Sequence, residues 1–444
     1  MNKTYSIITY GCAMNRSDSE RIVTVLEKAG YRKVCRSRTP DILVFNACSV
    51  RQSAIDRIYG QMEKFSELKR RNPHFKVIAT GCILPRDRQR FFKELDLIFN
   101  IKDLTNLPRF LKKLNKDERI LPPLPILAGS KGLSLKEISY FKTKPGRQSK
   151  FSALVPISFG CNRFCAYCAV PYTRGLEINR PGADILAEVA NLVSHGYKEI
   201  WLLGQTVSSW RDPQNKQYKF VDLLRDIEQI PGKFWVRFES SYILDFGNEL
   251  IDFLAKAKKV NNYLNLPLQS GSDRILKKMN RKYAVKQYSE ILKKMKAKIP
   301  DFSFSTDIII GFCGEMEKDF QDTYNVFKKI QPTMAYIAQY SSRPGTVAER
   351  LMKDNVLKKL KEARFEKLTR LLRKTAKENL GKEIGKTLEV LVDTYLPKRK
   401  ECLGRSRNFK TVRFKSQKNL CGKFANVKIL KAREFELEGR PEKS

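Results

Sequence analysis

Three short apolar segments near the start of the chain alternate with amphipathic stretches. The apolar segments predict strands at residues 6–12, 41–48 and 76–82, and helical patterns separate them at 18–29 and 50–70. Such strand–helix alternation predicts a parallel sheet covered by helices. Ligands of these sheets bind beyond the carboxyl ends of the strands, so the residues there are candidates for a functional site.

The same alternation resumes after residue 150. Strands are predicted at residues 153–158, 199–204, 234–239, 263–267, 302–310 and 334–340. Amphipathic helices with 3.6-residue spacing, for example at 182–195 and 283–298, lie between them. Six such units are too few to close an eight-stranded barrel, so we predict an open, partial barrel with its site at the carboxyl ends of the strands.

The last part of the chain has a different pattern. Residues 353–377 predict a basic helix whose apolar stripe packs on the barrel, with Leu357, Leu360, Phe365, Leu368, Leu371 and Leu372 in the stripe. Short alternating strands follow at 387–392, 405–414 and 425–430. Because basic and aromatic side chains interleave in them, they predict a small RNA-binding β-barrel. We expect phosphate contacts from Arg405, Arg407, Lys410 and Arg413.

These patterns predict an α/β protein with three parts. A parallel-sheet domain spans residues 1–126, and the prolines at 122, 123 and 125 close it. A linker spans 127–150, the partial barrel with its basic helix spans 151–382, and the small β-barrel spans 383–444.

Composition narrows the class of function. The 444-residue chain has 86 Lys and Arg against 47 Asp and Glu, a net charge of +39. This excess favours a polyanionic partner such as RNA, although a general lysine bias is the alternative. No apolar run approaches the length of a membrane span, and there is no apolar signal region, so the ten cysteines are expected to be reduced thiols in the cytoplasm. With only two histidines, histidine-based acid–base catalysis is nearly excluded.

Three cysteines stand close together at 161, 165 and 168, with the spacing C-x3-C-x2-C. Thiolates select iron–sulfur clusters or zinc, but a closed zinc site needs a fourth ligand, and no Cys or His follows until His195. Three ligands on a four-iron cluster leave one iron open, an arrangement that resembles the radical S-adenosylmethionine (SAM) enzymes. A buried or zinc-binding group is the alternative. We call Cys161, Cys165 and Cys168 the radical triad.

A second cysteine set lies upstream. Cys12, Cys48 and Cys82 each end one of the first three predicted strands, so they can converge although they are far apart in the chain. Gly11 and Gly81 precede two of them and would allow sharp turns. Three independent buried thiols are the alternative, but their shared register favours a second cluster. We call Cys12, Cys48 and Cys82 the upstream triad.

Two triads in this order resemble the methylthiotransferase family over essentially the whole chain, and the tRNA branch that acts on isopentenyladenosine beside the anticodon most of all. The most branch-specific stretch is Pro171-Tyr172-Thr173-Arg174-Gly175. The other matching stretches are residues 10–15, 18–21, 46–51, 180–181, 203–205, 266–272, 306–312 and 342–346. Two departures are Cys313, where the family usually has Pro, and residues 176–179.

The resemblance implies a radical SAM reaction in three parts. The cluster on the radical triad binds and cleaves SAM to a 5′-deoxyadenosyl radical, the cluster on the upstream triad holds the sulfur, and a second SAM supplies the methyl group. It thus implies two 4Fe-4S clusters and SAM as cofactors. The residues expected to bind the cofactor are Tyr167, Gly204, Gln205, Gln269, Ser270 and Gly311. The carboxyl-terminal segment of the chain also resembles the TRAM domain.

The expected partners are the anticodon stem-loop of tRNA and an electron donor of flavodoxin or ferredoxin type, and we expect a monomer without membrane contact. Two alternatives stay open. One is the same chemistry on threonylcarbamoyladenosine in tRNA or on a ribosomal-protein aspartate. The other is a non-catalytic RNA-binding iron–sulfur redox sensor, which would have no need of an open iron.

Overall fold

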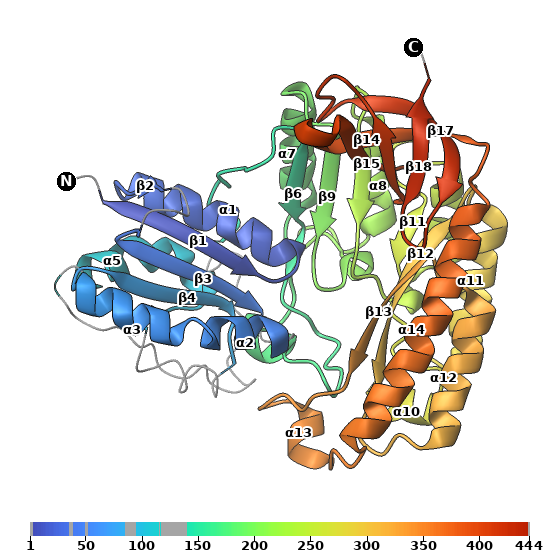
Figure 1. Ribbon diagram of the computed structural model, residues 1–444, viewed down its shortest axis with the longest axis horizontal. Helices are drawn as coiled ribbons and strands as arrows, with labels where there is room; N and C mark the ends of the chain where they lie inside the picture. The colour runs from blue at the N-terminus through green and yellow to red at the C-terminus, as the bar shows by residue number, and fades with distance from the viewer. Residues whose placement is uncertain are drawn as a thin grey trace. The chain divides into compact units, whose positions relative to one another are not determined.

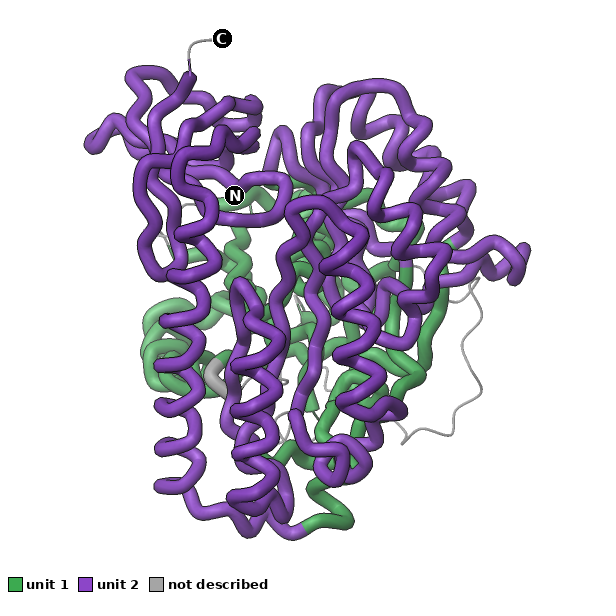
Figure 2. Tube along the Cα trace, turned by 90° about the vertical axis from the view of Figure 1, so that its right-hand side faces the viewer, with its two compact units in different colours: residues 1–148, 158–180, 341–352 green, residues 149–157, 181–340, 353–444 purple. Residues whose placement is uncertain are grey.

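The computed structural model describes residues 3–34, 39–48, 52–84, 95–114, 116 and 140–442. Cys35, Arg51 and the prolines at 122–125 therefore lie outside the described residues. The chain forms two compact units (Figure 2). Unit 1 comprises residues 1–148, 158–180 and 341–352, and unit 2 comprises 149–157, 181–340 and 353–444. The radical triad thus belongs to the same unit as the amino-terminal sheet.

Unit 1 is built on a five-stranded parallel sheet in the order β2-β1-β3-β4-β5. Its strands are β1 (Thr4–Tyr10), β2 (Arg32–Lys33), β3 (Ile42–Cys48), β4 (Lys76–Cys82) and β5 (Leu97–Ile98). Its helices include α1 (Ala13–Lys28), α2 (Gln52–Tyr59), α3 (Met62–Arg71), the 3-10 helix η1 (Ile101–Asn106) and α5 (Leu107–Leu114), several of them labelled in Figure 1. The sheet prediction is confirmed, but the single helix predicted over 50–70 is wrong, because the chain breaks at Gly60.

Both faces of this sheet are buried because apolar residues fill both sides of β3. Ile42 and Val44 pack in one cluster with α1, η1 and α5. Leu43 and Phe45 pack in another with α2 and α3. A continuous apolar run is typical of a parallel strand that is covered on both faces.

Unit 1 also takes in two later segments of the chain. The first holds β7 (Ser158–Phe159), α6 (Val170–Arg174) and β8 (Ile178–Asn179), and the second holds α13 (Val347–Leu351). Phe159 is fully buried in the α1-side core, and the Ala348 amide donates to the Ala166 carbonyl at 2.8 Å. The segment that carries the radical triad is therefore packed into the amino-terminal unit.

Unit 2 contains the six predicted barrel strands, all parallel to their neighbours. They are β6 (Ser152–Pro156), β9 (Glu199–Leu203), β10 (Trp235–Phe238), β11 (Tyr263–Asn265), β12 (Ser303–Ile310) and β13 (Met334–Gln339). They form two three-stranded sheets, β10-β9-β6 and β11-β12-β13, and a parallel bridge between Val236 and Val260 links the two. Within the described residues, β6 and β13 do not pair with each other, as expected for an open partial barrel.

Helices pack around these strands and bury a large apolar core. They are α7 (Gly182–Ser194), α8 (Phe220–Gln229), α9 (Asn248–Lys256), α10 (Asp273–Lys278), α11 (Val285–Lys298), α12 (Glu317–Ile330) and α14 (Lys358–Gly381), and η2 (Val207–Ser209) and η3 (Ile243–Asp245) are single 3-10 turns. Of the predicted stripe, Leu368 and Leu372 of α14 are buried, but Leu357 is 75% and Leu360 38% exposed, because Leu357 precedes the helix and Leu360 lies in its first turn. In the described part of the chain, no helix is long and apolar enough to cross a membrane.

The carboxyl-terminal strands close into a five-stranded barrel in the order β14-β15-β16-β18-β17. They are β14 (Thr387–Leu396), β15 (Glu401–Ser406), β16 (Thr411–Lys415), β17 (Phe424–Ala432) and β18 (Leu437–Pro441), with the 3-10 turn η4 (Pro397–Arg399) after β14. The small-barrel prediction is confirmed. The single strand predicted over 405–414 is wrong, because residues 407–410 form the turn of a hairpin between β15 and β16.

This turn, which we call the hairpin tip (residues 407–410), docks on the amino ends of the unit 2 strands. The Phe409 ring stacks on Tyr263 with centroids 4.5 Å apart and meets Trp201 edge-on at 5.5 Å. Arg407 donates to the carbonyls of Ala257 and Val260. The tip therefore covers the end of the partial barrel opposite to the carboxyl ends of its strands.

The contacts of Arg407, Lys410 and Arg413 bear on the predicted phosphate contacts. Lys410 is buried and pairs with the buried Glu383 at 2.6 Å, and Arg407 is held by the carbonyls just described. Arg413 is bound between Glu401 at 3.0 Å and Glu436 at 2.8 Å. These three side chains are thus engaged within the chain, although Arg407 keeps a buried Nε without a partner among the described residues, and this engagement disfavours them as the main phosphate contacts.

Candidate functional site

The upstream triad converges at the carboxyl edge of the unit 1 sheet. Cys48 and Cys82 end adjacent strands and are direct register partners, and both are buried. Cys12 is exposed and lies two residues beyond β1 as the N-cap of α1. The prediction that Cys12 ends a strand is wrong by these two residues, because the helix begins at once, but Cys12 still lies at the same edge.

Two asparagines hold the Cys12 turn against β3. The Asn15 side chain accepts from the Cys12 amide at 3.3 Å and donates to Asn46 Oδ1 at 2.9 Å. Asn46 donates back to the Asn15 carbonyl at 2.7 Å. At Gly81, φ is +102°, and a Cβ would stand 2.4 Å from the Ala47 carbonyl oxygen, so only glycine fits before Cys82.

A buried cation completes the surroundings of Cys82. Arg174, the last residue of α6, places Nε 2.9 Å from Cys82 Sγ and Nη2 2.6 Å from Asp18 Oδ2. The hydrogen bond with the Cys48 thiol and the charge of Arg174 outweigh burial and lower the pKa of Cys82. Cys82 is thus held in surroundings that favour the thiolate, the form in which cysteine binds metals.

The radical triad lies in the turn before α6. Cys161 and Cys165 are buried, and the Cys168 amide donates to the Cys165 carbonyl at 2.9 Å. Backbone amides point at two of the sulfurs, from Arg163 to Cys161 and from Val170 to Cys168, each at 3.5 Å. Burial, together with the nearby thiols of Cys165, Cys161 and Cys82, raises the pKa of Cys168. Cys168 is therefore near both its own triad and the upstream triad.

The residues fit iron–sulfur clusters better than a single ion. Among the described residues, no three Cys, His, Asp or Glu side chains are arranged to hold one metal ion. A four-iron cluster makes a different demand, because each thiolate binds a separate iron. Thiols that form no disulfide are grouped at one sheet edge and one turn, with amide and guanidinium donors on their sulfurs, and this arrangement meets that demand.

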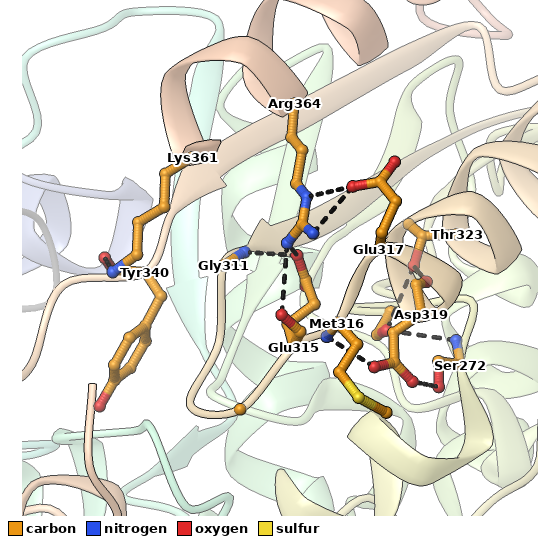
Figure 3. Close-up of polar contacts among 12 residues, drawn as sticks. Ser272, Gly311, Glu315, Met316, Glu317, Asp319, Thr323, Tyr340, Lys361 and Arg364 are labelled. Carbon is orange, nitrogen blue, oxygen red and sulfur yellow. Dashed lines mark hydrogen bonds and ion pairs between the residues drawn. The ribbon is translucent and has the colours of Figure 1, made fainter. Parts of the chain in front are cut away.

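The predicted SAM-binding residues of unit 2 all follow the carboxyl ends of strands: Gly204 and Gln205 follow β9, Gln269 and Ser270 follow β11, and Gly311 follows β12. Figure 3 shows how the Gly311 loop is held by a helix. Glu315 accepts from the Gly311 amide at 2.9 Å and from Arg364 of α14 at 2.8 Å. A Cβ at Gly311 would clash with the buried Lys361, which explains the glycine.

Two predicted SAM-binding residues in the loop after β11, Gln269 and Ser270, differ in their contacts. Ser270 is fully buried, and its hydroxyl lies 3.3 Å from that of Thr323 and accepts from the Ser272 amide, so it holds the loop. Gln269 has a left-handed φ of +71°, and its buried Oε1 has no hydrogen-bond partner in the described part of the protein. Of the two, Gln269 is the one that keeps a side-chain acceptor without a partner among the described residues. Tyr167, in the radical-triad turn, is half-buried.

A row of polar side chains lies between β11 and β12, and of its members only Asp307, in the matching stretch 306–312, was noticed from the sequence. The Tyr263 and Ser305 hydroxyls lie 2.6 Å apart, and Asn265 donates to Asp307 at 3.0 Å. Polar residues occupy alternate positions on each of these two strands, and this alternation was the sequence pattern that could have revealed the row. Paired polar groups within a parallel barrel are candidates for substrate contacts.

Six parallel barrel strands and a three-cysteine turn define the class of radical SAM proteins. The radical SAM superfamily matches residues 155–327, the uncharacterized protein family UPF0004 matches 4–100, and the TRAM domain matches 381–441. Over 98% of this chain, two proteins named tRNA-2-methylthio-N(6)-dimethylallyladenosine synthase are 38% identical. They come from Clostridium botulinum (96% covered) and Carboxydothermus hydrogenoformans (99% covered). The chain belongs to the radical SAM methylthiotransferase family.

Solved structures agree with this fold. The radical S-adenosylmethionine methyltransferase TsrM from Kitasatospora setae, with cobalamin and a 4Fe-4S cluster bound, is similar with a TM-score of 0.55 at 12% identity. The similarity covers 79% of this chain and 74% of that one. At this identity the similarity concerns the fold alone.

Proposed function

We propose that this protein adds a methylthio group to position 2 of isopentenyladenosine beside the anticodon of tRNA. The observation that carries the proposal is the 38% identity, along 98% of the chain, to synthases named for this product. The stretch at residues 171–175, which most resembles this branch, supports it. The carbon to be modified carries an unactivated C–H, so acid–base chemistry alone would not suffice.

The two triads have different roles in this proposal. The radical triad would hold the 4Fe-4S cluster that binds SAM at its open iron, and the upstream triad would hold the one that carries the sulfur. When bound, these groups supply radical chemistry and the sulfur. The chain's own part is to orient the cofactors and to exclude water. Gly204, Gln205, Gln269 and Gly311 are proposed to hold SAM, and an external flavodoxin-like or ferredoxin-like protein to supply electrons.

For tRNA we propose a different surface from the hairpin tip. Four exposed cations lie on two loops at the far end of the β15–β16 hairpin: Lys398, Arg399, Lys400 and Lys418. The Ser416 amide donates to the Lys400 carbonyl at 2.9 Å, which joins these loops. We call these four residues the basic rim. Phosphate contacts of this kind are independent of sequence, so the rim would provide affinity rather than specificity.

The substrate test compares three tRNAs under anaerobic, reducing conditions: unmodified, isopentenylated and threonylcarbamoylated. Burial of the five-carbon tail at about 0.8 kcal/mol per CH2, discounted for incomplete enclosure, gives about 3 kcal/mol. That is roughly a hundredfold preference in kcat/KM for the isopentenylated tRNA over the unmodified one.

Nucleoside mass spectrometry reads the product. Equal turnover of the unmodified tRNA, or product from the threonylcarbamoylated tRNA alone, contradicts the proposal, and the second result favours that branch. A methylthiolated ribosomal protein in place of a modified tRNA favours the other branch. Iron loading and tRNA binding without any SAM cleavage or methylthiolated product would point to the non-catalytic alternative.

A further inference from the structure

Arg174 is a buried cation that contacts three partners, Asp18, Phe159 and Cys82. Its side chain is 0% exposed, and so is that of Asp18, which accepts from Nη2. Asp18 is fixed in turn, because its second oxygen accepts from the Tyr140 hydroxyl at 2.8 Å. The guanidinium also lies over the Phe159 ring, 5.1 Å from its centroid. A planar guanidinium held in this way has little freedom to turn.

Two of its donors point away from Asp18. Nε donates to Cys82 Sγ at 2.9 Å, and Nη1 is buried without a hydrogen-bond partner within the described residues. A buried donor that stays unpaired destabilises the folded state, and more so when it is charged. Asp18 alone therefore does not satisfy all the donors of Arg174. A further acceptor beside Cys82 would satisfy the remaining one, Nη1.

We propose that Arg174 is a positioning residue for the cluster of the upstream triad, with Asp18 as its anchor, and that it raises the reduction potential of that cluster. The inference rests on the proposed function only in taking the upstream triad to hold a cluster. Reduction adds negative charge to the cluster, and a fixed cation with N–H donors on its sulfurs stabilises the reduced form.

The test uses the full-length chain with the radical triad changed to Ala, so that any cluster is on the upstream triad. In this background, Arg174→Gln removes the charge, and Arg174→Lys keeps it without the fixed fork. Arg21→Gln is the matched control, because Arg21 is also buried, lies over the Tyr140 ring at 4.7 Å and, among the described residues, donates to Ser17 rather than to a cysteine of either triad. EPR-monitored redox titration gives the midpoint potential, and iron analysis gives the loading.

We expect Arg174→Gln to disfavour the reduced form at least tenfold, which is a fall of about 59 mV for a one-electron couple. The midpoint potential should fall less in Arg174→Lys and should not change in Arg21→Gln. If Arg174→Gln loads no iron, the test is the potential of Arg174→Lys, which should be lower than that of the background protein. Iron bound with an unchanged potential and EPR spectrum in the Arg174 variants overturns this inference alone. A background protein that binds no iron overturns the upstream cluster itself, and with it that part of the proposed function.

Discussion

The hairpin tip makes a quantitative prediction about unit 2. Phe409 is half-buried between Tyr263, Trp201 and the guanidinium of Arg237, which lies 4.8 Å from its centroid. A fully buried Phe→Ala change costs about 3–5 kcal/mol, and aromatic pairs contribute about 0.5–1.5 kcal/mol each. Because the ring is only half-buried, we expect Phe409→Ala to reduce the free energy of unfolding of unit 2 by about 2 kcal/mol.

Urea unfolding followed by tryptophan fluorescence measures this change selectively. All three tryptophans, Trp201, Trp210 and Trp235, belong to unit 2. At a slope of about 3 kcal/mol per molar urea, 2 kcal/mol lowers the midpoint by roughly 0.7 M. Trp201 should also become more solvated before unfolding, which shifts its emission to the red.

Phe435→Ala is the matched control, since this ring lies on the same small barrel but is 40% exposed. A surface change of this kind should stay within about 0.5 kcal/mol. If Phe409→Ala and Phe435→Ala unfold at the same urea concentration with the same emission maximum, the tip does not support the barrel. The same docking predicts that truncation before residue 383 exposes Trp201, which meets Phe409, and Trp235, which meets Phe424 edge-on at 4.8 Å, so truncation is a poor way to measure RNA binding.

Four further predictions concern the sites. Anaerobically reconstituted protein should hold about eight irons, and the radical triad changed to Ala about four; an unchanged iron content would show that this triad is not a ligand set. With the upstream triad changed to Ala, 5′-deoxyadenosine should still form from SAM without any methylthiolated tRNA, and detection of that product would remove the sulfur-carrying role. Changing the four cations of the basic rim to Gln should make the slope of log Kd for tRNA against log salt shallower by about 0.9 for each phosphate that is no longer neutralised; an unaltered slope means that tRNA binds elsewhere. For Asp319, hydrogen bonds from Arg274, Ser272 and the Met316 amide outweigh burial and lower the pKa from 3.8 to about 2. Its folded pKa is below its unfolded value, so the carboxylate contributes about 2 kcal/mol above about pH 4, which is lost as the pH falls through 2. The stability difference between wild type and Asp319→Asn should shrink over that window, and a constant difference would contradict the assignment.

The sequence predicted the strands well because each is a short apolar run between polar helices. Its errors have local causes. Residues 405–414 keep a regular alternation through the hairpin tip and contain no glycine or proline that would predict a turn. The turn depends on Phe409, whose φ of +63° is not predicted by its residue type. The basic residues of that segment look exposed in sequence, but their partners, such as Glu383 for Lys410, lie far away in the chain.

The candidate site shows the same limit. Cysteine spacing and strand ends predicted the two triads, since both depend on local pattern. The contact between Arg174 and Cys82 joins residues 92 positions apart, and the pairing of Asp18 with Arg174 spans 156. Arg174 was noticed only as part of a branch-specific stretch, because pair contacts over such separations leave no periodic signal in one sequence.

The discontinuity of unit 1 has a consequence for synthesis of the chain on the ribosome. The sheet strands up to β5 emerge first, but Tyr140 and Phe159 of its α1-side core, the Arg174 partner of Asp18 and the helix α13 emerge much later. Amino-terminal domains usually fold as units while translation proceeds. Here the nascent sheet must wait with three cysteines at its open edge: Asp18 stays without its Arg174 partner until residue 174 has been made, and unit 1 is complete only at residue 352. Insertion of iron and sulfide is thereby coupled to the length of chain translated, and a pause in the middle of the message would leave thiols exposed to oxidation.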